Sequence, residues 1–468
     1  MRFPKTFRHG GLTVDLHRDW RGAAPVQNSF LPSTAIVLLK QHAGAPSRCL
    51  VRRGEFVREG SVLGKPESTG AAQVHAPVPG VVRDLKRVRL PEGGECEAAV
   101  IVLEGSFDRL GKRVEKYVWK SMSRGDLLQT LRDRGVVEAE APGRPLFELL
   151  QARDRPSLLV LNGVESEPYL RTEAAVLAER GAEVLEGLAL LRKIVSPEET
   201  ILALDSTDEA TIARLRELAA ELSPQPEIRI LEPRYPQDLE NRLLEVLAKG
   251  RKRAAQAEEP KGKGAKEGGA RESGSREGGA KEKASGREKG AEALFVRPST
   301  ALAAYEAVVL AKPFVDRYVT VSGGAVKNPA VLKVRIGTPI GDLIEECGGF
   351  VGTPERLVIG GPFRGLPVHD LDAPITKQSS AVLALRPDET RKSRRQPCIR
   401  CGRCVDRCPE RLDPAGLYRR VAAGRQAEAE AMGLAACTSC GICGYACPSR
   451  LPLVEALAAA RDKMEARR

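Results

Sequence analysis

Two short cysteine runs near the end of the chain have the spacing of iron–sulfur ligands. Residues 398–409 read CIRCGRCVDRCP and residues 437–448 read CTSCGICGYACP, so both follow the pattern Cys-x2-Cys-x2-Cys-x3-Cys-Pro. A [4Fe–4S] cube needs four thiolates at the corners of a tetrahedron, and one tight loop with this spacing supplies three of them. In two-cluster modules the fourth thiolate is the last cysteine of the other run.

Crossed ligation of this kind assigns all eight clustered cysteines. The predicted ligands of cluster 1 are Cys398, Cys401, Cys404 and Cys447, and those of cluster 2 are Cys437, Cys440, Cys443 and Cys408. Structural zinc is the alternative, but zinc sites use two pairs of ligands, whereas each run here has a three-plus-one pattern. The clusters are expected to carry electrons and to leave no open catalytic position. Of the 11 cysteines in the chain, only Cys49, Cys96 and Cys347 remain, and these are expected to be structural or incidental.

Composition favours a multidomain protein and gives no sign of a nucleic-acid module. The 468 residues suffice for about three domains, and with only 4% aromatic residues the cores must consist of Val, Leu, Ile and Ala. The net charge of +12 could suit nucleic acid, an anionic membrane or an acidic protein such as a ferredoxin, but no basic stretch interleaved with aromatics is present. Without a secretory signal or a run of about 18 apolar residues, a cytosolic chain with no direct membrane span is expected.

The first hundred or so residues show strand patterns interrupted by Gly and Pro. Segments 49–64 and 72–85 alternate apolar and polar positions, with turn residues between them. Their sequences, CLVRRGEFVREGSVLG and AQVHAPVPGVVRDL, resemble the hammerhead of biotinyl and lipoyl carrier domains. The lysine that such carriers modify is absent, because the intervening turn reads ESTGA (67–71). We therefore predict a barrel-sandwich hybrid within residues 1–115, without swinging-arm chemistry.

The next segment alternates helix and strand patterns, which is typical of an α/β domain with a parallel sheet. The predicted helices are 126–135, 172–194 and 206–222, and the predicted strands are 157–163 and 201–205. Gly135 is a plausible C-cap of the first helix. Parallel sheets bind ligands at the carboxyl ends of their strands, and the segment NGVESEP (162–168) would lie at such an end.

A charged tract interrupts this domain. Residues 250–292 are rich in Gly, Lys, Arg and Glu and nearly free of apolar side chains, so we predict a disordered insertion. A polybasic docking segment is the alternative, although glutamates are interspersed throughout. The predicted helix 301–313 follows, and strand and turn patterns over 317–349 and 357–365 resemble the β-grasp module called SLBB.

These features place six segments along the chain. They are a β-rich domain with the barrel-sandwich hybrid (1–115), the first part of the α/β domain (120–249), the insertion (250–292), the end of the α/β domain (293–315), the SLBB module (316–388) and a helical two-cluster ferredoxin-type domain (389–468).

The order of motifs along the chain resembles one known family. The motifs are GG near the start, QHAGAP (41–46), NGVESEPYL (162–170), RYPQ (234–237), VTVSGGAV (319–326), VIGGPFRG (358–365) and the two cysteine runs. Together they resemble the C subunit of the Rnf electron-transport complex over essentially the whole chain apart from the insertion. The resemblance implies an α/β domain related to the flavin subunit of respiratory complex I. It also implies FMN, contact with NADH, and clusters that pass electrons to membrane-bound partners.

The resemblance also implies site residues, and this chain departs from the family around them. Asn162, Glu165 and Glu167 match the family's flavin and nicotinamide side. The family's Gly-rich loop GLGGAGFPT, whose amides can approach the flavin phosphate, is replaced by a segment that carries Glu138 and Glu140. The family's YPQGGEK reads YPQDLEN (235–241) here, NVGT reads RPST (297–300), and ECEPYLT reads ESEPYLR.

We therefore hypothesise that FMN is lost or weakly held while both [4Fe–4S] clusters persist. The resemblance implies a peripheral subunit on the cytoplasmic side of the cell membrane. Its implied partners are other subunits of an Rnf-like complex, with ferredoxin and NAD(H) as further candidates. Its own NADH-oxidising step is absent, altered or supplied by another subunit.

Two other functions remain open from the sequence. One is a soluble flavin and iron–sulfur enzyme resembling the cobalamin reductase of bacterial microcompartments, which would need an intact flavin loop. The other is a non-catalytic scaffold that keeps its clusters for structural reasons. Reduction of the clusters by NADH, by ferredoxin or by neither would separate the three hypotheses.

Overall fold

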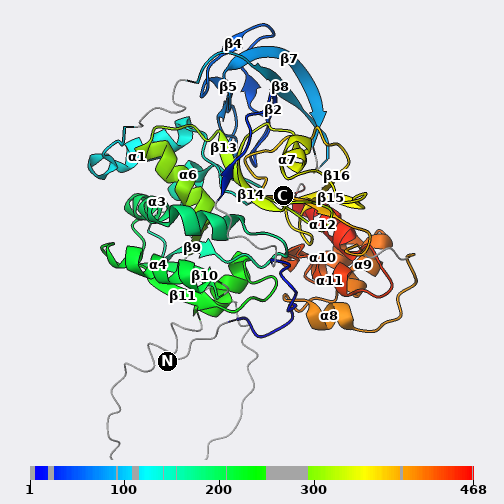
Figure 1. The fold of residues 1–468 in the computed structure, drawn as a ribbon. Coiled ribbons are helices and arrows are strands. Elements are labelled where there is room, and N and C mark those ends of the chain that lie inside the picture. The colour runs from blue at the N-terminus through cyan, green and yellow to red at the C-terminus, as the bar shows by residue number, and fades with distance from the viewer. Residues whose placement is uncertain are drawn as a thin grey trace, which may run out of the picture.

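The fold is described from a computed structural model. The described residues are 6–18, 26–90, 93–107, 115–140, 142–153, 155–206, 208–248, 293–390, 394–465 and 467. The predicted insertion 250–292 lies outside the described residues. Figure 1 shows the described chain as four neighbouring parts: a β-rich part at the top, an α/β part at the left and below, a sheet with one helix at the centre, and a helical part at the right.

The β-rich part is the predicted barrel-sandwich hybrid. One sheet has the strand order β2-β8-β7-β4 and the other β3-β5-β6, and all of their pairings are antiparallel. The strands are β2 (Thr34–Leu38), β3 (Arg48–Cys49), β4 (Phe56–Val57), β5 (Val62–Lys65), β6 (Val74–His75), β7 (Gly80–Arg89) and β8 (Glu95–Leu103). Each of the two segments that alternate in sequence contributes strands to both sheets: 49–64 contains β4 and most of β5, and 72–85 contains β6 and the start of β7. Alternation places their apolar side chains on one side of each strand.

The α/β part contains a four-stranded parallel sheet in the order β11-β10-β9-β12. The strands are β9 (Leu158–Gly163), β10 (Glu199–Asp205), β11 (Glu227–Leu231) and β12 (Ala293–Val296). The helical elements are η1 (Trp119–Ser121), α1 (Arg124–Asp133), α2 (Leu146–Ala152), α3 (Thr172–Val195), α4 (Glu209–Ala220) and α6 (Pro298–Val309), with a further helix at 240–248. The two segments on either side of the insertion thus join in one sheet, since β12 pairs with β9.

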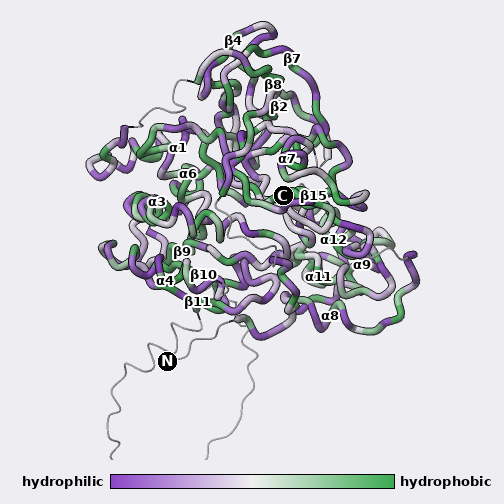
Figure 2. The backbone as a smooth tube through the Cα atoms, in the orientation of Figure 1, coloured by the Kyte–Doolittle hydropathy of each residue, from purple (hydrophilic) through white to green (hydrophobic). Residues whose placement is uncertain are grey.

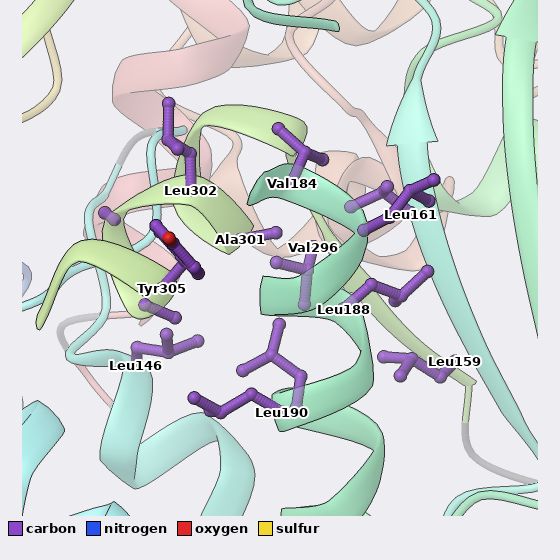
Figure 3. Close-up of a cluster of buried hydrophobic side chains, with 14 of the residues drawn as sticks. Leu146, Leu159, Leu161, Val184, Leu188, Leu190, Val296, Ala301, Leu302 and Tyr305 are labelled. Atoms are coloured by element: carbon purple, nitrogen blue, oxygen red, sulfur yellow. The ribbon is translucent and has the colours of Figure 1, made fainter. Parts of the chain in front are cut away.

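Both faces of the parallel sheet are buried, as the continuous apolar run before Asn162 predicts. On one face the core residues are Leu159, Leu161 and Val296 of the sheet, Val184, Leu188 and Leu190 of α3, and Ala301, Leu302 and Tyr305 of α6 (Figure 3). On the other face, Leu158, Val160 and Phe295 pack with Leu243 of the 240–248 helix and with Phe7 of the N-terminal segment. Figure 2 shows the hydrophobic residues concentrated along β9, β10 and the helices that cover them.

The SLBB part is a six-stranded sheet in the order β1-β14-β13-β17-β15-β16. Its elements are β1 (Gln27–Asn28), β13 (Asp316–Ser322), β14 (Ala330–Arg335), α7 (Ile340–Glu346), β15 (Arg356–Ile359), β16 (Leu366–Val368) and β17 (Ala381–Leu385). Strand β1 comes from far earlier in the chain and pairs in parallel with β14. No sequence pattern predicts this pairing, because a strand of two residues has no periodicity.

The helical part holds the cysteine runs. Its elements are α8 (Arg403–Arg407), α9 (Pro414–Ala422), α10 (Gln426–Ala431), η2 (Leu434–Ala436), α11 (Ile442–Ala446) and α12 (Leu453–Glu465). Leu417, Ala429, Leu434 and Leu457 form its own small core. The expected fold class, a multidomain α/β and β protein with a helical two-cluster domain at the end, is confirmed.

One predicted helix is displaced. The pattern at 301–313 predicted a helix over those residues, whereas α6 spans Pro298–Val309. Proline is favoured at the first helical position, so Pro298 can begin the helix three residues earlier. Pro313 disfavours helical backbone at Lys312, and Ala311 has a positive φ of 48°, so the helix ends before them.

The crossing of α3 and α6 generates a stability prediction. A Cβ at Gly187 of α3 would lie 2.1 Å from the carbonyl oxygen of Ala301, so the helices can approach this closely only with glycine there. We expect Gly187→Ala to lower stability by about 1–3 kcal/mol, because the helices must separate. Thermal unfolding followed by circular dichroism measures this loss.

Gly125→Ala, on the exposed first turn of α1, is the matched control. Its Cβ would meet only the Ser123 hydroxyl, at 3.7 Å, so this change should be neutral or slightly stabilising. Equal unfolding midpoints for the two variants would contradict the close packing of α3 on α6.

Candidate functional site

The two cysteine runs have matching backbone conformations. They lie 39 residues apart in sequence (437 − 398 = 39). Left-handed backbone occurs at Arg400 and Gly402 of the first run and Arg411 just after it, and at the equivalent Ser439, Gly441 and Arg450 in and after the second, with φ between 52° and 80°. Non-glycine residues rarely adopt this conformation, so its repetition indicates one loop design used twice. In each run a short helix, α8 or α11, begins after the glycine.

The last cysteine of the first run lies with the second run. Cys408, Cys437, Cys440 and Cys443 line a single cavity, and Cys408 is buried. Apolar side chains, among them Ile442 and Leu457, complete the walls. These four cysteines are the predicted ligand set of cluster 2, and their shared cavity supports that assignment.

The last cysteine of the second run lies near a cysteine of each run. Cys447 is buried in a small apolar cluster with Leu451 and Leu453, and both Cys404 of the first run and Cys443 of the second pack against that cluster. Cys398 and Cys401 are exposed. The predicted cluster 1 ligands therefore lie nearer the protein surface than those of cluster 2.

Two glycine contacts hold the cysteine runs against the rest of the chain. A Cβ at Gly10 would lie 2.7 Å from the carbonyl carbon and oxygen of Cys408, and the Gly11 amide donates to the carbonyl of Arg407 at 2.9 Å. A Cβ at Gly441 would lie 2.6 Å from the carbonyl oxygen of Phe363 in the SLBB part. The N-terminal glycine pair therefore has a physical role that the sequence alone did not reveal.

Aromatic side chains connect the second cysteine run with the α/β part. Tyr235 donates its hydroxyl to the carbonyl of Cys440 at 2.5 Å and stacks on Phe363, with ring centroids 4.4 Å apart. Phe363 in turn contacts Tyr445 edge-on, at 5.3 Å. Tyr235 lies in the RYPQ motif, so a motif identified only by resemblance proves to contact the cysteine region directly.

Asn162, Glu165 and Glu167 all lie at the carboxyl end of β9, as predicted, and all three are buried. Their hydrogen bonds are nevertheless made within the protein. The Asn162 amide donates to the carbonyl of Asp238 at 2.8 Å. Glu165 accepts from the amides of Glu173 and Ala174, each at 3.0 Å, and so satisfies free N–H groups at the start of α3.

Glu167 binds an arginine from the SLBB turn. It accepts from Nε of Arg364 at 2.8 Å and from the amide of Phe363 at 3.1 Å. Burial raises the pKa of Glu167, although Arg364 acts in the opposite direction. Burial would lower the pKa of Arg364, but Asp238 and Glu167 together hold it well above its usual value. The carboxylate and guanidinium thus form a buried ion pair.

Models of four known families match consecutive parts of the chain. They are the RnfC barrel sandwich hybrid domain (residues 5–106), the Nuo51 FMN-binding domain (131–266), the SLBB domain (318–367) and the 4Fe-4S dicluster domain (397–452).

Curated relatives extend the similarity over nearly the whole chain. The C subunit of the ion-translocating oxidoreductase complex of Rhodobacter capsulatus is 28% identical over 98% of this chain and 83% of its own length. The C subunit of the proton-translocating ferredoxin:NAD(+) oxidoreductase complex of Clostridium ljungdahlii is 29% identical over 88% of this chain and 84% of its own length. The Pseudomonas aeruginosa counterpart is 30% identical, over 87% of this chain and 49% of its own length. The chain belongs to the RnfC family.

This RnfC-family chain keeps the fold of the FMN-binding domain but not a phosphate-binding loop. Where the family has glycines, this chain has the acidic side chains Glu138 and Glu140, and the Glu140 carboxylate would repel a phosphate. Beside them lies a cavity of about 430 Å³, whose lining includes the acidic residues Glu138, Glu140 and Glu240 as well as Arg144 and Arg153. The nearby Arg297 is already bound to Glu140 at 2.9 Å and to Asp238 at 3.2 Å. The loops that replace the family's phosphate-binding loops therefore do not fit the phosphate of FMN.

The sequence identified most of this site but missed its cations. The three loops that differ from the family could be identified in the sequence, because they lack glycines and an asparagine that the family has. Arg364 contacts Glu140, Glu167 and Asp238. The sequence does not predict these contacts, because Arg364 lies in another domain. Its place in the VIGGPFRG motif marked it as part of the family pattern, but the order of motifs does not predict which side chains are in contact.

Glu138 generates a pH prediction. Burial raises the pKa of its carboxyl from 4.5 to about 8, and within the described residues its Oε2 has no hydrogen-bond partner. The folded protein therefore holds a proton that the unfolded chain releases near pH 4.5. This contribution to stability is fully present below pH 4.5 and is lost as pH rises towards about 8, at up to about 1.4 kcal/mol per pH unit.

Glu138→Gln should flatten this dependence, because the amide is a neutral isostere of the protonated acid. We expect the variant to match the wild type near pH 5 and to exceed it in unfolding midpoint near pH 8. A series of thermal melts in matched buffers tests this expectation. Parallel pH profiles for the two proteins would show that Glu138 is ionised in the fold.

Proposed function

We propose that this chain is the electron-transfer subunit of an Rnf-type ion-translocating oxidoreductase complex. In this role it relays electrons through two [4Fe–4S] clusters. Its family membership, its dicluster domain and its relatives, which are subunits of such complexes, support this function. These relatives do not favour the soluble cobalamin reductase or the non-catalytic scaffold.

The observation that carries the proposal is the position of the last cysteine of each run. Cys408 shares a cavity with the second run, and Cys447 packs beside Cys404 of the first. We propose that cluster 1 is bound by Cys398, Cys401, Cys404 and Cys447, and cluster 2 by Cys437, Cys440, Cys443 and Cys408. When bound, the clusters supply one-electron redox chemistry, and the crossed cysteines hold the two close together.

The two clusters then have different positions in the relay. Cys398 and Cys401 are exposed, whereas Cys440 lies beneath Tyr235 and Phe363 at the junction with the other domains. We propose that cluster 1 exchanges electrons with a partner at the surface. Cluster 2, which lies deeper in the protein, then exchanges electrons with cluster 1. The domain limits expected from the sequence, with the dicluster domain at 389–468, form part of this proposal.

Partners and location follow from the relatives. Because the Clostridium ljungdahlii complex is named for ferredoxin and NAD(+), we propose the same electron carriers for the complex that contains this chain. No helix within the described ranges is long and apolar enough to cross a membrane. We propose a peripheral position on the cytoplasmic side, held by the membrane subunits.

Replacing the crossed cysteines tests the ligation. Cys408→Ala should give the same residual iron content and electron paramagnetic resonance spectrum as Cys440→Ala, because both remove a ligand of cluster 2. Cys447→Ala should instead match Cys401→Ala. The wild type should contain about eight iron atoms per chain, and each variant should fall towards about four.

Cys347→Ala is the matched control, because this buried cysteine lies in α7's apolar surroundings, away from both runs. It should keep the full iron content. A Cys408→Ala spectrum that matches Cys401→Ala would show that each run binds its own four-cysteine cluster, and crossed ligation would be wrong.

Isolation from native membranes tests membership of a complex. A tagged form of the chain, solubilised in mild detergent, should co-purify with integral membrane subunits and bring its iron with it. If the chain is recovered alone and iron-loaded from the soluble fraction, with nothing retained on membranes, it acts outside such a complex.

A further inference from the structure

We propose that the three loops which hold FMN in the family form an ionic clasp in this chain. The clasp consists of Arg297 and Arg364 with Glu140, Asp238 and Glu167. It occupies the place of the flavin phosphate and ties the α/β part to the SLBB turn that rests on cluster 2. This inference rests on the proposed function only for the presence of cluster 2.

The three loops that depart from the family contact one another directly. Glu140 replaces a glycine of the first loop, Asp238 replaces a glycine of the second, and Arg297 replaces the asparagine of the third. Arg297 donates to Glu140 from Nε at 3.2 Å and from Nη2 at 2.9 Å, and Nη2 also reaches Asp238 at 3.2 Å. The three substitutions lie far apart in the sequence, but in the folded protein the charges that they introduce pair with one another.

A second contact joins the first and third loops. Thr300 donates its hydroxyl to Glu138 at 3.0 Å and accepts from the amide of Ala139 at 2.9 Å. The loop backbone is thus held by RPST side chains, and its amides do not form an open cradle for an anion.

Arg364 extends the clasp to the SLBB part. It donates from Nε to Glu167 at 2.8 Å, from Nη1 to Glu140 at 3.2 Å, and from Nη2 to Asp238. All three of its nitrogens are therefore committed within the protein. Arg297 is equally occupied, since its Nη1 donates to the carbonyl of Val164 at 2.8 Å. Neither guanidinium is available to a phosphate.

The inner part of the clasp is shielded from water. The side chains of Asp238 and Glu167 are each 3% exposed and that of Arg297 is 10% exposed, whereas Arg364 is 22% and Glu140 is 39% exposed. Burial would raise the pKa of Asp238, but Arg364 and Arg297 hold it below its usual value. Removal of one arginine would leave buried carboxylates without a counter-charge, which is strongly destabilising.

The clasp also positions the cysteine region. Phe363 precedes Arg364 in the same turn, stacks on Tyr235 and meets Gly441 closely. Figure 1 shows the β15–β16 region beside the helices of the cysteine part. A shift of Arg364 would therefore displace the side chains that cover Cys440.

Ligand binding tests the loss of the flavin site. FMN is titrated into anaerobically purified, cluster-loaded protein, and quenching of flavin fluorescence reports binding. The wild type should co-purify with no FMN and show no saturable binding. The Glu140→Gly/Asp238→Gly variant frees both guanidinium groups for a phosphate, so its FMN affinity should rise at least about tenfold. Stoichiometric FMN in the wild type would overturn the proposal.

A double-mutant cycle between Asp238→Asn and Arg364→Gln tests the clasp itself. The single changes should each lower the unfolding midpoint by several degrees, and the double change should cost clearly less than their sum. The exposed pair Arg48–Glu67, with side chains 59% and 61% exposed, is the matched control and should show no coupling. Additive losses at Asp238 and Arg364 would overturn the clasp.

Hydrogen exchange provides a readout that does not depend on global stability alone. Arg364→Gln should speed exchange over 360–365 and 437–443 more than over β9, because the clasp connects the first two segments. Uniform acceleration would contradict the positioning role. Iron content is measured on the same samples, so a failure of the cluster proposal appears as missing iron and stays distinct from these outcomes.

Discussion

The buried contact of Arg364 with Glu140, Glu167 and Asp238 is the interaction on which the arrangement of domains depends. A guanidinium largely withdrawn from water requires its donors to be satisfied, and here the acceptors come from three loops of another domain. The geometry fixes where the SLBB turn can lie. Because that turn also carries Phe363, the same ion pairs determine how the cysteine region meets the rest of the molecule.

The cysteine region is held by backbone contacts as well as by this clasp. Gly10 and Gly441 each lie where a side chain would collide with a carbonyl group, so two separate segments approach the runs as closely as the backbone allows. Close, rigid contact suits an electron relay, since transfer needs fixed distances but no moving parts. The same contacts leave Cys398 and Cys401 at the surface, where a partner can reach them.

Much of the fold could be predicted from local pattern. The continuous apolar run before Asn162 and Gly135 after α1 each indicated elements that the structure contains. The start of α6 was missed because Pro298 begins a helix as readily as it ends one. Strand β1 was missed because its pairing with β14 depends on a partner about 300 residues away and on no property of its own two residues.

The ligand chemistry and the departure from the family's flavin loops can be predicted from the sequence alone. Thiolate spacing and the identity of a residue at a motif position are local properties, which a chain displays without folding. That the departures form one network depends on the folded arrangement. Glu140, Asp238, Arg297 and Arg364 are separated by tens of residues or more, and the contact between opposite charges exists only once the sheet and the SLBB turn are packed together. Long-range packing also decided which cysteine run receives Cys408, because that depends on how α8 and α11 lie against each other.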